Sequence, residues 1–370
     1  MKSAVLKCSV LGALFAFAVG YAGESLSADL RIGSSAALSG PAALLGQRFH
    51  AGAKAWFDQV NQRGGVHGMK IVVDLRDDAY ESSRAEANTR ILAEDSRTLA
   101  LFGYIGTPTS REALPFVHRL KIPFVGAYTG AAMLRDPFDV SVFNVRASYA
   151  DEAGALARAM ANAGVRKLAV LYQADGFGRA GLEAMRSAAG VAGIDIAALT
   201  SVKRNTSLDK AEVQAMIESA QSDAIFMVSS YGTCAAFVRQ AREQGYSGRF
   251  YSLSFPGKEP LREALGGSLE GVTISQVVPD VQDRSLPVVA SYQQAMRKSG
   301  DTHFDSISLE GFIAARVLVE GIRRATPPLT RESLRQSLDG LGTLDLGGFA
   351  LTYSARRHLG SSHVELVSAK

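Results

Sequence analysis

The segment 175–181, "DGFGRAG", contains the G-x-G-x-x-G spacing of a dinucleotide-binding fingerprint. Such glycines let a pyrophosphate approach the backbone at a helix N-terminus. Here three residues separate the preceding apolar run from the first glycine, and Asp175 would place negative charge where the phosphates must lie. The acidic residue expected about 20 positions further on should follow the second strand, but Asp195 stands at the start of that strand. We therefore interpret the motif as a glycine-containing loop that enters a helix, with Phe177 packed or lining a cleft, and not as a site for NAD or flavin.

Other patterns with catalytic potential are weak. None of the six histidines is paired with cysteine or carboxylate at a metal-ligand spacing. Ser207 and Lys210 match Ser-x-x-Lys, but the companion motifs of that enzyme class are absent, and we expect a helix to begin there with Ser207 as its N-cap. The chain has no Gly-x-Ser-x-Gly nucleophile elbow and no glycine-rich phosphate loop ending in Gly-Lys. These observations predict a protein that is not an enzyme and that holds no metal or cofactor.

The N-terminal residues have the three parts of a secretory signal peptide. Two lysines supply a basic start, residues 10–20 form an uninterrupted apolar run, and small residues follow, with cleavage predicted after Ala22 or Ala28. A membrane anchor is the competing interpretation, but the run is much shorter than the ~20 residues that span a bilayer. We therefore predict a cleaved signal peptide over residues 1–28 and a periplasmic protein.

The composition agrees with an exported globular protein. The 370 residues are 47% hydrophobic and carry a formal net charge of +4. The basic residues are scattered, which argues against a nucleic-acid partner. Removal of residues 1–28 leaves Cys234 as the sole cysteine, so the mature chain cannot form an intramolecular disulfide. Export without disulfides is typical of a bacterial periplasmic protein with a sizeable core, and we interpret Cys234 as a small buried residue.

From residue 29 the chain alternates β-branched runs with amphipathic runs, which predicts parallel sheets with helices on both faces. In the first series the predicted strands are 30–37, 69–75, 99–104, 122–128 and 142–146, and the predicted helices are 44–65, 82–96 and 110–120. In the second series the predicted strands are 167–173, 194–202, 223–230, 249–254 and 271–278, and the predicted helices are 151–164, 181–190, 207–220 and 235–245. Three further helix-like runs and two short strands, near 347–353 and 363–368, end the chain. The two series predict an α/β fold with two doubly wound parallel-sheet lobes.

Several segments, taken in order, resemble the leucine/isoleucine/valine-binding type of periplasmic solute-binding protein, the receptors of ABC importers. They are "SSAALSGPAALLGQ", "WFDQVNQRGGVHGMKIVVDLRDDAYES", "LFGYIGTPTS", "IPFVGAYTG" and "VLYQADGFGRAG". The resemblance implies the type I periplasmic binding protein fold, whose two lobes are joined by three crossovers and close on a ligand. It places residues 29–146 and 277–345 in lobe one, and residues 147–276 and 346–370 in lobe two. It also implies a monomer that is recognised by the membrane permease subunits of an importer, which are separate chains.

The resemblance also implies a ligand-binding set in lobe one. Tyr104 and Thr107, from one segment, are both candidate ligand-binding residues. Thr107 matches a hydroxyl that receives the ligand carboxylate; its alternative role is to cap a helix that starts near Ser110. The loop 128–130 matches a segment that offers backbone groups to the ligand. The family's usual threonine aligns with Gly130, and Thr129 comes one place earlier, so Tyr128, Thr129 and Gly130 are all candidates.

The remaining candidates come from both lobes. Leu45 matches a lobe-one residue, often aromatic, that covers the ligand. Tyr149 follows the first crossover and Tyr231 follows a predicted strand, so both are lobe-two candidates to close over the ligand. Helix N-termini, hydroxyls and backbone N–H groups at strand ends suit a carboxylate.

Two departures from the family bear on the ligand. Amino-acid binders of the family place an acidic residue after the strand 249–254 to hold the ligand ammonium, and here that position is Ser254, which is a candidate ligand-binding residue. Because a buried ammonium without a carboxylate is costly, either Asp175 or Asp151 substitutes, or the ligand is not a plain α-amino acid. The second departure is a cystine of some members, whose two positions are Tyr80 and Gly106 here.

We therefore predict an extracytoplasmic solute-binding protein of an ABC importer that captures a small carboxylate-bearing ligand, an amino acid or a related amide or organic acid, between its lobes. A periplasmic sensor that feeds a signalling receptor is the alternative, and its sequence would share all of these features. A nucleotide-dependent enzyme is the third possibility, and it lacks a catalytic constellation.

Overall fold

Lobe one is organised by a five-stranded parallel sheet in the computed structural model, which describes residues 29–368. The predicted signal peptide, 1–28, lies outside the described residues. The strand order is β2-β1-β3-β4-β5. The strands are β1 (Leu30–Ala36), β2 (Ile71–Asp77), β3 (Thr98–Phe102), β4 (Phe124–Val125) and β5 (Val142–Phe143). The helices between them are α1 (Ala43–Gln62), α2 (Ser82–Glu94) and α3 (Thr107–Leu120), with a 3₁₀ turn at Ala132–Leu134. β1 and β3 are almost wholly buried, as expected for parallel strands covered on both faces.

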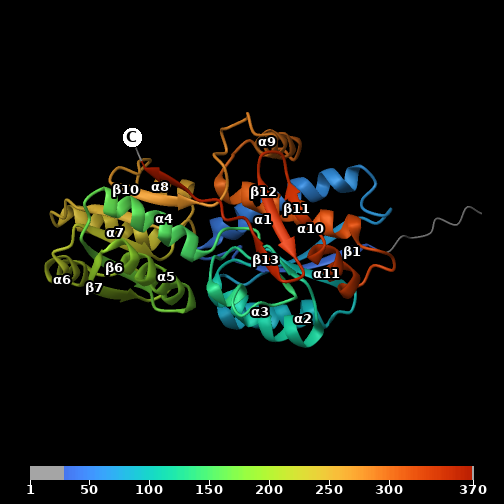
Figure 1. The fold of residues 1–370 in the computed structure, drawn as a ribbon, viewed down its shortest axis with the longest axis horizontal. Helices are drawn as coiled ribbons and strands as arrows, with labels where there is room; N and C mark the ends of the chain where they lie inside the picture. Colours follow the sequence, from blue (N-terminus) through green and yellow to red (C-terminus); the bar gives the residue numbers. More distant parts are fainter. Residues whose placement is uncertain (1–28, 369–370) are drawn as a thin grey trace, which may run out of the picture.

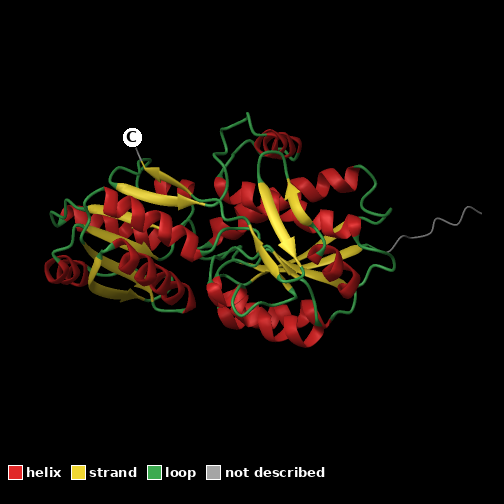
Figure 2. Ribbon diagram, in the orientation of Figure 1, coloured by secondary structure: helices red, strands yellow, loops and turns green. Residues whose placement is uncertain are grey.

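Lobe two repeats this arrangement around a six-stranded sheet in the order β14-β10-β9-β8-β6-β7. The strands are β6 (Lys167–Gln173), β7 (Asp195–Val202), β8 (Ala224–Val228), β9 (Arg249–Ser252), β10 (Val272–Gln276) and β14 (Glu365–Ser368). The helices are α4 (Tyr149–Asn162), α5 (Gly176–Ala192), α6 (Lys210–Ala220), α7 (Tyr231–Glu243) and α8 (Lys258–Ala264). Only β14 runs antiparallel, to β10. The two lobes lie side by side, and in each the strands are sandwiched between helices (Figures 1 and 2). The predicted α/β fold with two parallel-sheet lobes is confirmed.

The C-terminal part returns to lobe one before it ends in lobe two. Its helices are α9 (Pro287–Lys298), α10 (Ser306–Arg324) and α11 (Arg331–Asp339). They are followed by a small antiparallel sheet of β11 (Gly342–Asp345), β12 (Ala350–Ser354) and β13 (Arg357–Gly360). The Tyr353 hydroxyl donates to the Asn144 carbonyl (2.9 Å), and the Ser361 N–H donates to the Val145 carbonyl (3.0 Å).

These contacts correct the expected lobe boundary at 345/346. Residues 346–361 pack with lobe one, and the third crossover lies between β13 and β14, which pairs with lobe two. Sequence analysis did not predict β11 and β13 as separate strands. The sequence pattern of such short, exposed strands does not indicate which lobe they pack against.

Helices α1 and α10 approach each other closely in lobe one. A Cβ built at Gly52 would lie 1.8 Å from the Ser308 carbonyl oxygen, and one at Gly311 would lie 1.9 Å from the Phe49 carbonyl oxygen. Only glycine permits this backbone-to-backbone contact. The pair thereby seals the side of the lobe-one sheet opposite to α2 and α3 (Figure 1).

The glycines of the segment 175–181 serve the packing of α5. Asp175 is the N-cap, and its carboxylate accepts from the N–H groups of Phe177 (2.9 Å) and Gly178 (3.3 Å). A Cβ at Gly178 would lie 1.8 Å from the Gln173 carbonyl oxygen, and one at Gly181 would lie 2.4 Å from a methyl group of Val228. Close helix–sheet packing therefore explains the glycine spacing, and the N-cap carboxylate occupies the position where a phosphate would bind.

The predicted N-cap of α6 is wrong. The helix begins at Lys210, and Asp209 rather than Ser207 is its cap. Asp209 accepts from the N–H of Glu212 (2.8 Å), whose side chain accepts in turn from the N–H of Asp209 (2.8 Å). This reciprocal capping box satisfies two backbone donors and fixes the start of the helix.

Candidate functional site

A cavity of about 870 Å³ lies between the lobes. Lobe one contributes Thr107 and Gly130 to its lining, lobe two contributes Tyr149 and Arg179, and the third crossover contributes Ser361. The cavity lies at the C-terminal ends of the parallel strands, where open α/β sheets bind ligands. Its volume is within the range of small-molecule sites.

Three buried hydroxyl groups meet at the inner wall of this cavity. The Thr129 Oγ1 lies 2.7 Å from the Thr107 Oγ1 and 3.2 Å from the Tyr149 hydroxyl oxygen. The Thr129 oxygen also accepts from the N–H of Ala131 (3.2 Å). The three side chains are at most 1% exposed. Sequence analysis placed all three among the candidates, and the structure brings them together.

Two helix N-termini point at the hydroxyl cluster Thr107–Thr129–Tyr149. Thr107 is the first residue of α3, which follows Gly106, and Tyr149 is the first residue of α4. The expected start of a helix near Ser110 is therefore corrected, and the Thr107 hydroxyl bonds to Thr129 rather than capping a helix. Burial raises the pKa of Tyr149 to about 12, so its phenol stays protonated and can donate. Helix N-termini and hydroxyl donors together favour an anionic group.

Gly130 joins the two lobes at this point. Its carbonyl accepts from the N–H of Tyr149 (2.8 Å). A Cβ built at Gly130 would lie 2.5 Å from the Tyr149 Cδ1 and 2.6 Å from the Tyr149 nitrogen. The position aligned with the family's threonine therefore has no room for a side chain, and Thr129 supplies the hydroxyl instead.

An aromatic cluster from both lobes fills the depth of the cleft. Phe255 packs on Phe177 with ring centroids 4.3 Å apart, and it lies 5.7 Å from Tyr128 and 5.9 Å from Tyr80. All four rings are at most 2% exposed. Phe177, which the sequence suggested as packed or cleft-lining, is packed in this cluster together with Tyr128. None of the four rings is among the residues that line the cavity, so the cluster joins the two lobes beside it.

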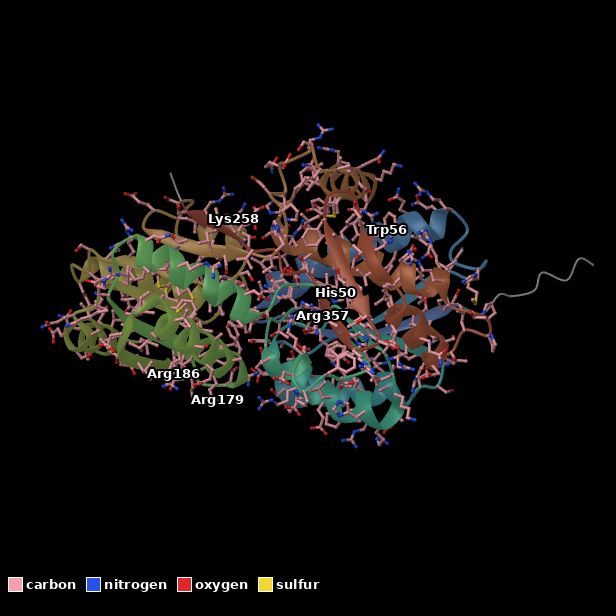
Figure 3. All side chains as sticks on the ribbon, viewed as in Figure 1. His50, Trp56, Arg179, Arg186, Lys258 and Arg357 are labelled. Carbon is pink, nitrogen blue, oxygen red and sulfur yellow. The ribbon has the colours of Figure 1, made fainter. Side chains whose placement is uncertain are left out.

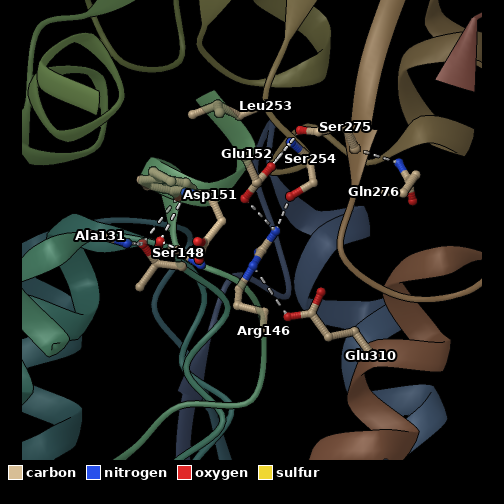
Figure 4. Close-up of polar contacts among 12 residues, drawn as sticks. Ala131, Arg146, Ser148, Asp151, Glu152, Leu253, Ser254, Ser275, Gln276 and Glu310 are labelled. Atoms are coloured by element: carbon tan, nitrogen blue, oxygen red, sulfur yellow. Dashed lines mark hydrogen bonds and ion pairs between the residues drawn. The ribbon is translucent and has the colours of Figure 1, made fainter. Parts of the chain in front are cut away.

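Ser254 lies beside a buried charge cluster at the first crossover (Figure 4). Its N–H donates to the Glu152 Oε2 (2.8 Å), and its Oγ accepts from the guanidinium of Arg146. Arg146 is 1% exposed, and its guanidinium lies 3.7 Å from both Glu152 and Glu310. The Arg146 Cζ also lies 4.5 Å from the centre of the Tyr128 ring. A buried guanidinium is thus the immediate neighbour of Ser254.

Three predicted site residues lie elsewhere. Tyr104 belongs to the lobe-one core, where its hydroxyl lies 2.9 Å from the Thr89 Oγ1 and its ring packs on Phe124, with centroids 5.1 Å apart. This corrects its assignment as a ligand residue, because the side chain points under α2 and α3. Leu45 lies in the first turn of α1 and is completely buried in the core. Tyr231 begins α7 and is half-buried, with the Leu44 backbone of lobe one near its hydroxyl, so it faces the other lobe outside the cavity lining.

Sequence analysis missed Arg146, Glu152 and Phe255. Arg146 ends the run "VFNVR", and Glu152 lies in the first turn of α4. Charged residues directly beside a predicted crossover were a usable signal. Phe255 directly follows Ser254, and a single aromatic residue after a strand carries no pattern that distinguishes a site residue from a core residue.

Comparison with known proteins gives the family. The family model described as "Periplasmic binding protein" matches residues 29–370. The chain belongs to the periplasmic binding protein family. The structure of a possible leucine/isoleucine/valine-binding protein from Rhodopirellula baltica is 33% identical, with a TM-score of 0.87 over 92% of this chain and 93% of that one. A Leu/Ile/Val-binding protein homologue (homolog 7) of Brucella abortus is 24% identical over 80% of this chain and 78% of its own length.

A third similarity concerns the fold of this periplasmic binding protein. The structure of a branched-chain amino acid ABC transporter protein from Thermus thermophilus with bound valine is 22% identical, with a TM-score of 0.83 over 92% of this chain and 93% of that one. The predicted resemblance and type I fold are thereby confirmed. The family consists of substrate-binding proteins, which agrees with the prediction that the chain is not an enzyme.

Membership of the family implies a periplasmic location. Within residues 29–368, no helix has the length and apolar character needed to cross a membrane. In the same residues no group of three or more histidine, cysteine or acidic side chains could hold a metal ion. Cys234 is buried in α7, as expected, and burial raises the pKa of its thiol to about 12.

Proposed function

We propose that this periplasmic binding protein captures a small carboxylate-bearing ligand between its lobes and delivers it to the membrane subunits of an ABC importer. The observation that carries the proposal is the cluster Thr107–Thr129–Tyr149, at two helix N-termini and on the wall of a cavity of about 870 Å³. A carboxylate there would accept from buried hydroxyls, and charge-assisted hydrogen bonds of this kind are among the strong ones.

Binding would proceed by hinge closure. Thr107 and Thr129 belong to lobe one and form a half-site that exists before closure. Tyr149 belongs to lobe two and completes the site when the lobes meet. Closure excludes water, so the hydrogen bonds to the carboxylate strengthen.

Delivery to an importer is supported by the relatives. The Thermus protein of this family is described as part of a branched-chain amino acid ABC transporter. The proposal includes export through the predicted signal peptide, 1–28, and function as a monomer. A sensor role, the alternative, would use the same cleft.

The test is thermal unfolding of the purified protein against a ligand panel, followed by calorimetric titration of any compound that shifts the transition. The panel contains amino acids, their amides, 2-oxo acids, dicarboxylates, aromatic acids and NAD. A ligand at ~1,000 times its dissociation constant should stabilise the protein by about 4 kcal/mol. The proposal predicts a shift with at least one class of carboxylate. Shifts confined to compounds without a carboxylate, or to NAD, would overturn it.

A further inference from the structure

Two arginines of the cavity lining have no acidic partner. Arg111 belongs to α3 of lobe one, Arg179 belongs to α5 of lobe two, and both line the cavity between the lobes. Within residues 29–368, no carboxylate oxygen comes within 4.0 Å of either guanidinium. Both residues are exposed. The cavity therefore has one uncompensated cation on each lobe.

These two outer arginines occupy equivalent places on helices that meet across the cleft. α3 begins at Thr107 and α5 begins at Gly176. A Cβ built at Gly176 would lie 3.7 Å from the Thr107 Cγ2 and 3.4 Å from the Arg111 Nη2, so the two helix N-termini are in contact beside the hydroxyl cluster. Arg111 and Arg179 each lie about one turn, ~5 Å, further along their own helix. Both cations therefore flank the part of the cavity just outside the hydroxyl cluster.

The sequence places two acids beside Arg179, and both are engaged by other groups. Asp175 and Glu183 lie four residues before and four residues after it, the spacing at which ion pairs form on a helix. Asp175 is the N-cap of α5 and lies 3.5 Å from the Arg204 Nε. Glu183 is paired with Arg186 (2.6 Å). The charge of Arg179 is therefore available to a ligand.

The remaining acids of the lining are Asp136 and Asp151. Asp151 accepts from the N–H (3.0 Å) and the hydroxyl (2.6 Å) of Ser148 and thereby caps α4. The sequence suggested Asp151 and Asp175 as substitutes for the acid absent at Ser254, and the structure shows that both are helix caps. Neither of them neutralises the outer arginines.

The hydroxyl cluster has a cation of its own. Arg135 lines the cavity, and its guanidinium donates to the carbonyl oxygens of Thr129 (3.3 Å), Ala131 (3.0 Å) and Arg146 (3.0 Å). Burial lowers the pKa of Arg135 to about 10, so it remains charged at neutral pH. A carboxylate at the hydroxyl cluster therefore has hydroxyl donors, two helix N-termini and a nearby arginine, and it does not require the outer arginines.

Closure of the cleft brings like charges together. Arg111 and Arg179 belong to different lobes, and Arg357, in the small sheet beside lobe one, also lines the cavity. Figure 3 shows Arg179 and Arg357 on opposite sides of the space between the lobes. Like charges that approach each other repel, whereas an anion between them is attracted by both. Guanidinium groups bind carboxylates through paired hydrogen bonds, so a carboxylate there would favour the closed form.

We propose that the ligand carries a second carboxylate, which Arg111 and Arg179 hold between the lobes. The inference rests on the proposed function, since the hydroxyl cluster must hold the first carboxylate. Because the outer arginines lie about one helical turn from that cluster, a short chain joins the two carboxylates. The ligand class is a dicarboxylate of about four to six carbons.

The test compares dicarboxylates with monoamides of the same size. Succinate is paired with succinamate, glutarate with glutaramate, and glutamate with glutamine, so that the members of each pair differ in one negative charge and hardly in shape. Affinities are measured by calorimetric titration at pH 7.5. We expect the dicarboxylate of at least one pair to bind ~10–100-fold more tightly than its monoamide, the range of a hydrogen bond to a charged group.

The outcomes separate the two proposals. If the monoamide binds as tightly as the dicarboxylate in every pair that binds, the second carboxylate is refuted while the proposed function stands. The same conclusion follows if only monocarboxylates of the wider panel bind. If no carboxylate binds, the proposed function itself fails, and this inference fails with it.

Variants identify the residues responsible. Arg111→Gln and Arg179→Gln should each lower the ratio of dicarboxylate to monoamide affinity ~5-fold or more, and both positions are exposed, so the variants should fold. Arg119→Gln in α3, where the arginine pairs with Glu94 (3.0 Å), and Arg158→Gln in α4 are the matched controls. Both control positions lie outside the cavity lining, so the parent's ratio should be retained. A ratio that is unchanged in both Arg111→Gln and Arg179→Gln would overturn the assignment.

Discussion

Arg204 of lobe two donates a hydrogen bond from its Nη1 to the backbone carbonyl oxygen of Tyr80 in lobe one, over 2.6 Å. The same guanidinium lies 5.5 Å from the centre of the Tyr80 ring, 3.5 Å from Asp175 and 3.8 Å from Glu81. Tyr80 is part of the aromatic cluster of the cleft. The contact therefore bridges the lobes directly beside the ligand site, and it can form only when the lobes are closed.

Loss of this hydrogen bond should destabilise the closed form of the protein and thereby weaken ligand binding. We expect Arg204→Ala to raise the dissociation constant roughly 3–30-fold, which corresponds to the ~0.5–2 kcal/mol of a hydrogen bond with its neighbouring charges. The change should come mainly from faster dissociation, measured by stopped-flow fluorescence. Arg186→Ala is the control, because Arg186 is an exposed arginine of the same lobe that pairs with Glu183 of its own helix. Equal effects of the two variants would show that the bridge has no special role in closure.

Thr107 provides a test of the carboxylate site. Thr107→Ala removes a buried donor at the N-terminus of α3, and a ligand carboxylate would lose a hydrogen bond worth ~1–3 kcal/mol. The dissociation constant measured by titration should rise about 5–150-fold. Thr109→Ala, in the same turn, is the matched control, since that hydroxyl donates to the carbonyl oxygens of Ile105 and Gly106, which directly precede α3. If Thr107→Ala binds as the parent does, Thr107 does not hold the ligand.

Gly130 should not tolerate any side chain. A Cβ there would lie 2.5 Å from the Tyr149 ring and 2.6 Å from its backbone nitrogen, so Gly130→Ala must displace either the loop or α4. We expect a loss of ~1–3 kcal/mol in the free energy of unfolding and a loss of ligand affinity of tenfold or more. Gly190→Ala in α5 is the control: a Cβ there meets nothing within 4 Å, and alanine in a helix is favourable. A Gly130→Ala protein with normal stability and affinity would contradict the described contact.

The sequence predicted the sheets well because each lobe-forming strand is a short apolar run between amphipathic helices. The hydroxyl cluster could also be found, since Thr107, Thr129 and Tyr149 all follow the ends of predicted elements. Tyr104 was misplaced for a simple reason. It lies in the same segment as Thr107, but it belongs to the connection between β3 and α3, where its side chain packs on Thr89 and Phe124 in the core, whereas Thr107 begins α3.

The charge cluster could not be predicted in the same way. Arg146, Glu152 and Glu310 come from a crossover and from helices of different lobes, and nothing in the local pattern states that three ionisable residues share one buried site. The third crossover was misplaced because β12 and β13 are short, half-exposed strands. Their pairing with one another and their contacts with lobe one are long-range properties.

His50 predicts how stability depends on pH. It is buried in α1 beneath the lobe-one sheet, with its Nε2 3.2 Å from both the Gly103 carbonyl oxygen and the Ser34 hydroxyl. Burial lowers its pKa from 6.5 to about 4. Between these values the unfolded chain binds a proton that the folded chain does not. Stability therefore falls as the pH falls from about 6.5 toward 4, by about 3 kcal/mol from this residue.

The measurement is urea unfolding of the parent and of His50→Gln at pH 7.5, 6.0, 5.0 and 4.5. The glutamine amide can still donate to Gly103, but it does not titrate, so the variant should lose less stability on acidification than the parent does. The two curves of unfolding free energy against pH should approach each other below pH 6. His303→Gln, at an exposed position, should reproduce the parent's slope. If the unfolding free energy of His50→Gln falls with pH in parallel with that of the parent, His50 is not the group responsible. The expected difference arises from its neutral ring, which is buried in the folded protein.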